Sequence, residues 1–261
     1  MNLIIAGHTN SYHTYTFEEA LRGIARAGFT YAELTAVPDW ADFVKPTDDP
    51  ARIRGVLEDA GLDCVAMSMH LEPGDEQSVA AARELVDWAG RFGLQHLNCA
   101  LGEAPEGSNE WHTNVAELVR RADAAGVSFN IEVHGPLART GAEVAAVLDQ
   151  LGETAGGINY DTGNVEFYGG VAMTDDLPGV VDRVRHFHLK DKLGGTKDWA
   201  FPALGGGHVD FATLGQLLGE RGATPAMSVE LEFHGEPWPP LAVVDDAMAV
   251  SRNHLAAVGL L

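Results

Sequence analysis

Short apolar runs alternate with amphipathic stretches along almost the whole chain, in units of roughly 30 residues. The apolar runs predict eight strands, at residues 3–8, 31–36, 63–70, 94–100, 127–134, 156–161, 184–190 and 226–233. Between them, apolar residues recur at helical spacing. Glycine is favoured where a helix ends, because it enters the left-handed backbone region without steric cost. Such glycines follow the helical stretches at Gly28, Gly61, Gly93, Gly126, Gly152 and Gly222.

Helix start signals stand before several of these stretches. Thr16 and Glu19 have the spacing of a capping box, and Thr140 with Glu143 repeats it. Asp49 followed by Pro50 is typical of an N-cap with proline in the first helical turn. The boundaries of the predicted helices therefore agree with the apolar periodicity.

Eight strands alternating with helices favour parallel βαβ units. No change in composition and no Pro- or Ser-rich linker divides the chain, so we interpret residues 1–261 as a single α/β domain, one (β/α)8 TIM barrel. The unit at residues 164–183 has the weakest helical periodicity. A doubly wound open sheet is the alternative fold, but no Gly-x-Gly-x-x-Gly follows the first predicted strand.

Charge and composition narrow the class of protein. The chain has 38 acidic and 17 basic residues, a formal net charge of −21, which disfavours binding to nucleic acid or to an anionic membrane surface. We find no apolar run of about 18 residues that would span a bilayer. The two cysteines and a first segment without a signal-peptide pattern favour a soluble cytoplasmic protein. Homo-oligomerisation stays open.

Histidines gather at the predicted strand ends. Barrel enzymes carry their active sites at the carboxyl ends of the strands. One histidine there is usually a satisfied polar residue, but several on one rim favour a site. The histidines so placed are His8, His70, His134, His188 and His234.

Period-2 alternation directs polar side chains of the last four strands into the barrel. These are Glu132 and His134, then Asp161, then His186, His188 and Lys190, then Glu230 and Glu232. A buried acid is unfavourable by several kcal/mol unless it is paired or binds a metal ion. The pattern therefore indicates either one divalent ion (Mn, Mg, Co or Zn) or a salt-bridge layer that uses Lys190. His186 lies deeper and is interpreted as structural.

These strands and the segment after them resemble the xylose-isomerase-like TIM-barrel superfamily of sugar isomerases and epimerases, which includes the AP endonuclease family 2. The resemblance rests on Ile131-Glu132-Val133-His134, Asp161-Thr162-Gly163-Asn164, His186-Phe187-His188-Leu189-Lys190-Asp191, the segment 204–211 and Ser228-Val229-Glu230. It implies a metal held by Glu132, Asp161, His188 and Glu230, with Glu232 as the alternative last ligand. It also implies that Glu132 and Glu230 are the catalytic acid and base.

The DNA-cleaving branch of the superfamily fits poorly. Its three-zinc cluster requires a histidine where Asn164 stands, and another where Asn98 stands. Residues 198–202 also lack the histidine expected before the glycine turn. The extra metals would have no ligands, and the charge of −21 repels DNA.

The resemblance implies an isomerase or epimerase acting on a sugar or polyol ketone. Such an enzyme removes a proton α to a carbonyl, and a divalent ion stabilises the enediolate. His134 and Lys190 are further candidates for proton transfer or substrate contact. The alternative for His134 is a partner of Glu132, and for Lys190 an ion pair with Glu232 or Asp191.

Further candidates for substrate contact lie on the other strands and in loops: Glu33, His70, Asn98 and Trp199, each with packing or loop support as the alternative. Trp40, Trp111 and Trp238 also lie in predicted loops or near helix starts, where aromatic faces suit sugars. The segment Leu204-Gly205-Gly206-Gly207 lies where many barrels bind phosphate, but no arginine cluster accompanies it. We favour a turn leading to an N-cap at Asp210.

Two other function classes stay open. The same site could expel a β-leaving group, as a lyase or dehydratase on a keto-sugar, keto-inositol or C-glycoside. A non-enzymatic sugar-binding subunit of a hetero-complex is the other alternative. The presence of all four residues implied as metal ligands argues against a subunit that only binds sugar.

Overall fold

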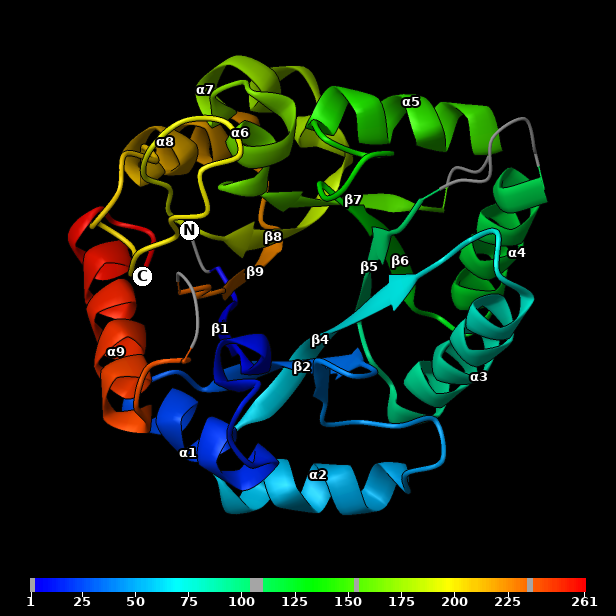
Figure 1. The fold of residues 1–261 in the computed structure, drawn as a ribbon, viewed down its shortest axis with the longest axis horizontal. Helices are drawn as coiled ribbons and strands as arrows, with labels where there is room; N and C mark the ends of the chain where they lie inside the picture. Colours follow the sequence, from blue (N-terminus) through cyan, green and yellow to red (C-terminus); the bar gives the residue numbers. More distant parts are fainter. Residues whose placement is uncertain (1–2, 104–109, 153–154, 234–236) are drawn as a thin grey trace.

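The computed structural model describes residues 3–103, 110–152, 155–233 and 237–261. Eight parallel strands close into a barrel, since β1 pairs with both β2 and β9. This closure confirms the predicted TIM barrel and excludes the open sheet (Figure 1). The barrel strands are β1 (Ile5–His8), β2 (Tyr31–Val37), β4 (Asp63–Leu71), β5 (His96–Leu101), β6 (Ser128–Glu132), β7 (Gly157–Asp161), β8 (Val184–Leu189) and β9 (Ala226–Val229).

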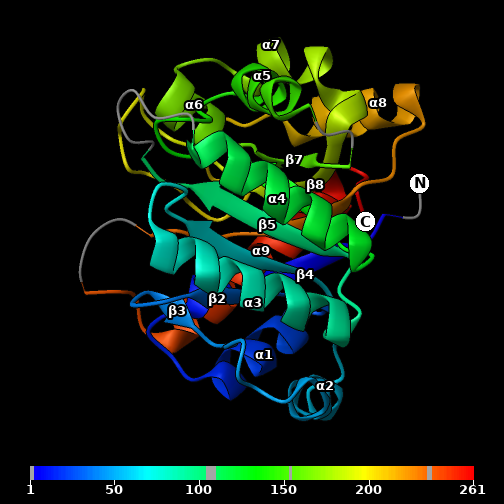
Figure 2. The same ribbon diagram turned by 90° about the vertical axis from the view of Figure 1, so that its right-hand side faces the viewer.

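Helices surround the barrel, as Figures 1 and 2 show. They are α1 (Phe17–Arg26), α2 (Pro50–Asp59), α3 (Glu76–Phe92), α4 (Glu110–Ala124), α5 (Gly141–Leu151), α6 (Asn164–Gly169), α7 (Met173–Asp176), α8 (Phe211–Arg221) and α9 (Leu241–Ala257), with 3-10 turns η1 (Thr9–Tyr12), η2 (Leu177–Gly179) and η3 (Val181–Arg183). Residues 164–183 form only short helices, as their weak periodicity predicts. No described helix is long and apolar enough to cross a membrane.

The helix boundaries confirm most of the predicted caps. Thr16 and Glu19 form a reciprocal capping box before α1, and Asp49 caps α2 with Pro50 in its first turn. The second capping box is only half formed. Thr140 accepts from the backbone of Glu143, but the Glu143 carboxylate accepts from the backbone and guanidinium of Arg139 instead. An arginine one residue before the cap thus diverts the carboxylate.

All six glycines predicted to end helices have positive φ, from 63° at Gly222 to 95° at Gly28. A side chain at these positions would be strained, so each glycine lets the chain leave its helix and turn toward the next strand.

Two predicted strands end two or more residues earlier in the structure, and β8 ends one residue earlier, at Leu189. β6 ends at Glu132 and β9 at Val229, so His134 and Glu230 lie in the loops that follow. The chain bends there because the backbone N–H groups find partners outside the ladder. His134 bonds to the carbonyl of Ala138, and Leu231 donates to Oγ of Ser11. A short strand β3 (Ala41–Asp42) that was not predicted pairs antiparallel with β2.

The inside of the barrel is polar below its carboxyl end. Asn98, Asn130, Asn159 and His186 are fully buried there and bond to one another across strands. The side chains that point outward, such as Ile131 and Val133, are buried in the apolar layer under the helices. The fold therefore directs its polar groups toward one end of the barrel, where the strands finish.

Candidate active site

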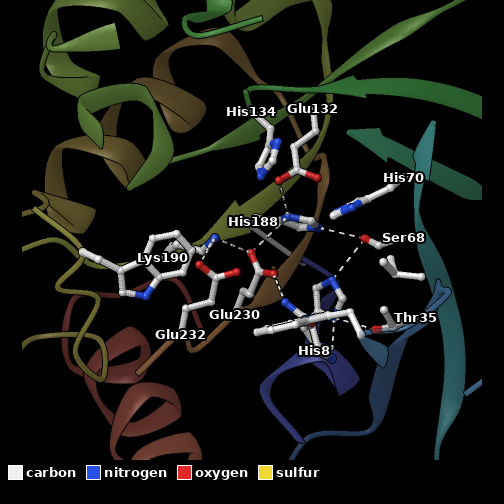
Figure 3. Close-up of a pocket in the computed structure, with 14 residues that line it drawn as sticks. His8, Thr35, Ser68, His70, Glu132, His134, His188, Lys190, Glu230 and Glu232 are labelled. Carbon is white, nitrogen blue, oxygen red and sulfur yellow. Dashed lines mark hydrogen bonds and ion pairs between the residues drawn. The ribbon is translucent and has the colours of Figure 1, made fainter. Parts of the chain in front are cut away.

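A cavity of about 200 Å³ opens where the barrel strands end (Figure 3). Its walls include polar side chains from β1, β4, β6, β8 and the segment after β9, and two tryptophans. The predicted rim histidines His8, His70, His134 and His188 all line it. His234 lies outside the described residues. The cavity is smaller than the ~300–1,000 Å³ typical of sites for drug-sized ligands, which suits a single sugar ring.

Glu132, Asp161, His188 and Glu230 converge at the floor of this cavity. One nitrogen or oxygen atom from each lies within 4.8 Å of the others, and all four residues are buried. The strand pairing explains this convergence, because Asp161 stands directly beside His188 in the register of β7 and β8. The residues implied as metal ligands thus form one compact group of three carboxylates and an imidazole.

Two features of this group fit a divalent cation. Nδ1 of His188 is buried and makes no hydrogen bond within the described structure. The closest charged partner of Oδ2 of Asp161 and of Oε2 of Glu230 is the Lys190 ammonium. The cavity floor and the layer beneath also hold four buried carboxylates and a partly buried fifth, with one lysine among them: Glu33, Glu132, Asp161 and Glu230, and then Glu232. Such an excess of buried negative charge is unfavourable unless protons or a metal ion compensate it.

Lys190 is the first residue after β8, and its side chain contacts this group. Its ammonium nitrogen lies 2.9 Å from Oδ2 of Asp161, 2.9 Å from Oε2 of Glu230 and 3.3 Å from Oε2 of Glu232. The salt-bridge layer weighed for the sequence is therefore present. It does not exclude a metal site, because each carboxylate oxygen has two lone pairs and can accept from the ammonium while it faces a second cation.

Burial and neighbouring charges shift the protonation of this group. Burial raises the pKa of Asp161 to about 6 and that of Glu232 to about 7, although Lys190 opposes both shifts. Burial would lower the pKa of His188, but the carboxylates of Glu33 and Glu132 outweigh it and raise the pKa well above its usual value. Perturbed ionisation of this kind is frequent at functional sites.

His134 lies beside Glu132 on the upper wall of the cavity (Figure 3). Its Nε2 is 3.2 Å from the hydroxyl of Tyr168, and its ring centroid is 5.6 Å from that of His70. Burial lowers the pKa of His134 to about 4. The imidazole is therefore neutral near pH 7 and could accept a proton.

Glu33 and Asn98, expected as substrate contacts, lie beneath the cavity rather than in its wall. Both are fully buried. Oε1 of Glu33 accepts from Ser68 at 2.6 Å and from Asn98 at 2.8 Å. Glu33 is the third residue of β2, and the residues of this strand that line the cavity are Thr35 and Val37, nearer its carboxyl end.

The tryptophans divide into two groups. Trp40 and Trp199 line the cavity and are partly exposed, at 43% and 39%. Trp111 is buried in the first turn of α4, and the indole of Trp238 donates to the carbonyl of Ser11. Two of the four tryptophans thus line the cavity. Of the other two, Trp111 packs inside the fold and Trp238 hydrogen-bonds to a neighbouring segment.

A family model described as xylose isomerase-like TIM barrel matches residues 21–254. The protein belongs to this family. An L-ribulose 3-epimerase of Methylomonas sp. (strain DH-1) is 29% identical over 214 residues, 75% of this chain and 71% of that enzyme. An inosose dehydratase of Serratia proteamaculans (strain 568) is 26% identical over 255 residues, 83% of each chain. A xylose isomerase-like TIM barrel protein from Mycobacterium smegmatis, in complex with magnesium, has a TM-score of 0.76 at 19% identity over 98% of both chains.

In this xylose isomerase-like barrel, the glycine-rich segment that begins at Leu204 is held by hydrogen bonds to the buried carboxylate of Asp191. The Asp191 carboxylate accepts from the backbone N–H groups of Gly205, Gly207 and Val209, at 2.8 to 3.0 Å. These donors are the groups that a phosphate would need. Asp210 caps α8 by accepting from the backbone of Thr213, which confirms the predicted turn and N-cap.

Several residues that contact the site were not predicted from the sequence. Asn10 in η1 donates to Oε1 of Glu230 at 2.6 Å and accepts from the indole of Trp40 at 2.6 Å. Tyr168 on α6 contacts His134, and Ser68 on β4 contacts Glu33. Ser68 had a sequence signal, since it shares a strand face with His70. Asn10 and Tyr168 had none.

Proposed function

We propose that this protein is a divalent-metal-dependent sugar isomerase or epimerase that moves a proton on the carbon α to a carbonyl. The observation that carries the proposal is the convergence of Glu132, Asp161, His188 and Glu230 within 4.8 Å at the floor of a sugar-sized cavity. The L-ribulose 3-epimerase relative supports the reaction class. The magnesium complex of the structural relative supports a metal in this family's fold.

These four residues would hold the ion, with three carboxylates and one imidazole. Oxygen-rich sets of this kind accept Mn²⁺, Mg²⁺, Co²⁺ or Zn²⁺. When bound, the ion supplies electrostatic stabilisation for the negative charge that develops on the substrate oxygens as the proton leaves.

Glu132 and Glu230 are proposed as the acid and base. Figure 3 shows them approaching from opposite walls of the cavity, with His188 between them. Asn10 binds Oε1 of Glu230, which fixes the rotamer of that carboxylate. A base on one face of the substrate and an acid on the other can invert or relocate a C–H bond. Neutral His134 and cationic Lys190 stand beside them to orient the hydroxyl groups.

The cavity favours an uncharged substrate of single-ring size. Among its described lining residues, Lys190 is the only lysine or arginine, and three carboxylates already surround its ammonium group. Glu132, Glu230 and Glu232 line the same space. A phosphate or carboxylate on the substrate would meet like charge there. The faces of Trp40 and Trp199 suit the C–H faces of a sugar.

A second candidate is a lyase or dehydratase with the same proton-abstraction step. The inosose dehydratase relative, which the chain matches over 83% of both lengths, favours it. In that case the carbanionic intermediate expels a β-hydroxyl or an aglycone and forms an enone, instead of regaining a proton at carbon.

The test is metal analysis followed by incubation with free ketoses and inososes in D₂O. Isomerase activity predicts one divalent ion per chain, and metal-dependent deuterium incorporation at the α-carbon without loss of water. An enone absorbance or a released aglycone would instead establish the lyase. Sugar binding that is equally tight in metal-stripped protein, with no exchange on any ketone, would contradict both and favour a binding subunit.

A further inference from the structure

Glu33 contacts His188 but does not line the cavity. Its Oε1 is 3.1 Å from Nε2 of His188, and its side chain is fully buried. The other ring nitrogen of His188, Nδ1, faces upward and lies 3.4 Å from Glu132 and 3.3 Å from Glu230. The two nitrogens of one imidazole thus face two separate groups of carboxylates.

A chain of hydrogen bonds fixes the direction of the contact between Glu33 and His188. The backbone N–H of Asn10 donates to Nδ1 of His8, so Nε2 of His8 carries the proton and donates to Oγ of Ser68 at 3.1 Å. The Ser68 hydroxyl then donates to Oε1 of Glu33 at 2.6 Å. Oε1 also accepts from the side-chain amide of Asn98 at 2.8 Å. Since a carboxylate only accepts, Nε2 of His188, which lies 3.1 Å from the same oxygen, must likewise be a protonated donor.

With its Nε2 proton bound by Glu33, His188 presents Nδ1 to the carboxylates above. Both partners of Nδ1 there are acceptors, and Nδ1 makes no hydrogen bond in the described structure. A neutral imidazole in this orientation directs its lone pair at the point where the four ligand atoms converge.

We propose that Glu33 is the positioning residue of the metal centre: it binds Nε2–H of His188 and so selects Nδ1 as the metal-facing nitrogen. The inference rests on the proposed function, since it assumes that the four-residue group binds a divalent ion. Carboxylates that hydrogen-bond a metal-ligating histidine fix its tautomer and ring orientation, and their removal weakens metal binding roughly 10–100-fold. Glu33 acts through His188 and does not contact the substrate.

A different role for Glu33 would be as a ligand itself. Glu33, His186 and His188 form a second buried group with ligand atoms within 4.8 Å. An ion there would take Nε2 of His188 away from its present partner. Metal stoichiometry therefore distinguishes a positioning residue from a ligand.

The experiment measures Zn²⁺ and Co²⁺ affinity of the full chain by titration calorimetry, for wild type, Glu33→Gln and Glu33→Ala. Glu33→Gln keeps an oxygen acceptor and loses the charge, so its affinity should fall roughly tenfold, and that of Glu33→Ala roughly 100-fold. The control is Asn130→Ala, which removes a buried polar side chain on β6, three strands away from β2 and bonded to Asn98. Its unfolding midpoint should fall while its metal affinity stays within twofold of wild type. If Glu33→Ala does not fold, the metal affinity of Glu33→Gln alone tests the inference.

A second readout is the ¹⁵N NMR spectrum of the His188 ring in the zinc-loaded protein. Wild type should show a protonated Nε2, and Glu33→Gln a weakened Nε2–H hydrogen bond. Wild-type affinity in both Glu33 variants would overturn the inference alone. A second ion per chain that is lost with Glu33 would also overturn it, because Glu33 would then be a ligand. Absence of any ion from the wild type would overturn both this inference and the proposed function.

Discussion

The ammonium nitrogen of Lys190 lies 2.9 Å from Oε2 of Glu230, at the floor of the cavity. It lies equally close to Asp161, and both side chains are buried with the lysine. Burial would lower the pKa of Lys190, but Asp161 and Glu230 raise it well above its usual value. The lysine is therefore a permanent internal cation that shares two carboxylates with the proposed metal site.

Replacing this internal cation should destabilise the metal-free protein. Lys190→Met leaves buried carboxylates without their partner, and loss of one member of a buried pair costs about 3–5 kcal/mol of unfolding free energy. Added Mn²⁺ or Zn²⁺ should restore much of the loss, since an ion at about 1,000 times its Kd stabilises the native state by about 4 kcal/mol. Urea denaturation with chelator and with metal measures both effects.

The matched control is Lys45→Met, which removes an exposed ion pair with Asp42. Its urea midpoint should equal that of wild type in both conditions. A Lys190→Met protein as stable as wild type in chelator would show that the carboxylates do not require the lysine.

Substitution of either proposed acid/base residue should stop turnover. Glu132→Gln and Glu230→Gln keep the side-chain volume but cannot take a proton, so the rate should fall by about 10²–10⁴-fold. Deuterium exchange into the substrate measures proton transfer separately from the net reaction. Asn10→Ala, which frees Oε1 of Glu230 without removing the carboxylate, should give a smaller loss. Near-wild-type exchange in either glutamine variant would contradict the assignment.

The neutral state of His134 predicts a pH dependence of stability. Burial lowers its pKa in the native state to about 4, against 6.5 in the unfolded chain. Between these values the unfolded state binds a proton that the native state does not. The contribution of His134 to stability therefore falls as the pH is lowered from 6.5 to 4, by up to about 3 kcal/mol.

His134→Asn should remove this contribution. Urea denaturation of the metal-free protein at several values between pH 4.5 and 7.5 should give a shallower acid-side decline for the variant than for wild type. Parallel curves for the two proteins would mean that His134 titrates similarly in the native and unfolded states.

The charge of the cavity predicts a preference for unphosphorylated substrates. Like charges brought together at a binding site cost several kcal/mol, so a ketose phosphate should have a kcat/KM at least about 100-fold below that of the free ketose. Glu232→Gln removes one carboxylate from the cavity wall. It should bring the kcat/KM for the ketose phosphate closer to that for the free ketose. Equal or better turnover of the phosphate ester would contradict the proposed neutral substrate.

The periodicity of the chain was sufficient to predict the barrel and most helix boundaries. Parallel strands buried on both faces leave apolar runs, and the turns between them require glycine with positive φ, as at Gly28 and Gly222. The inward alternation of acids and histidines likewise identified the group at the cavity floor. These features are local, so they can be recognised without knowing which strands become neighbours.

The contacts around that group depend on the tertiary structure. β9 ends at Val229 because the N–H of Leu231 finds Ser11, 220 positions away in the chain, and Asn10 reaches Glu230 across the same closure. Glu33 is a partner of His188 rather than a wall residue, because Thr35 and Val37, nearer the carboxyl end of β2, line the cavity. Local patterns along the chain were thus sufficient to predict the barrel and the residue types at its carboxyl end. Which side chains line the cavity, and which ones position them, follows from the folded arrangement, because hydrogen bonds between distant segments leave no local pattern.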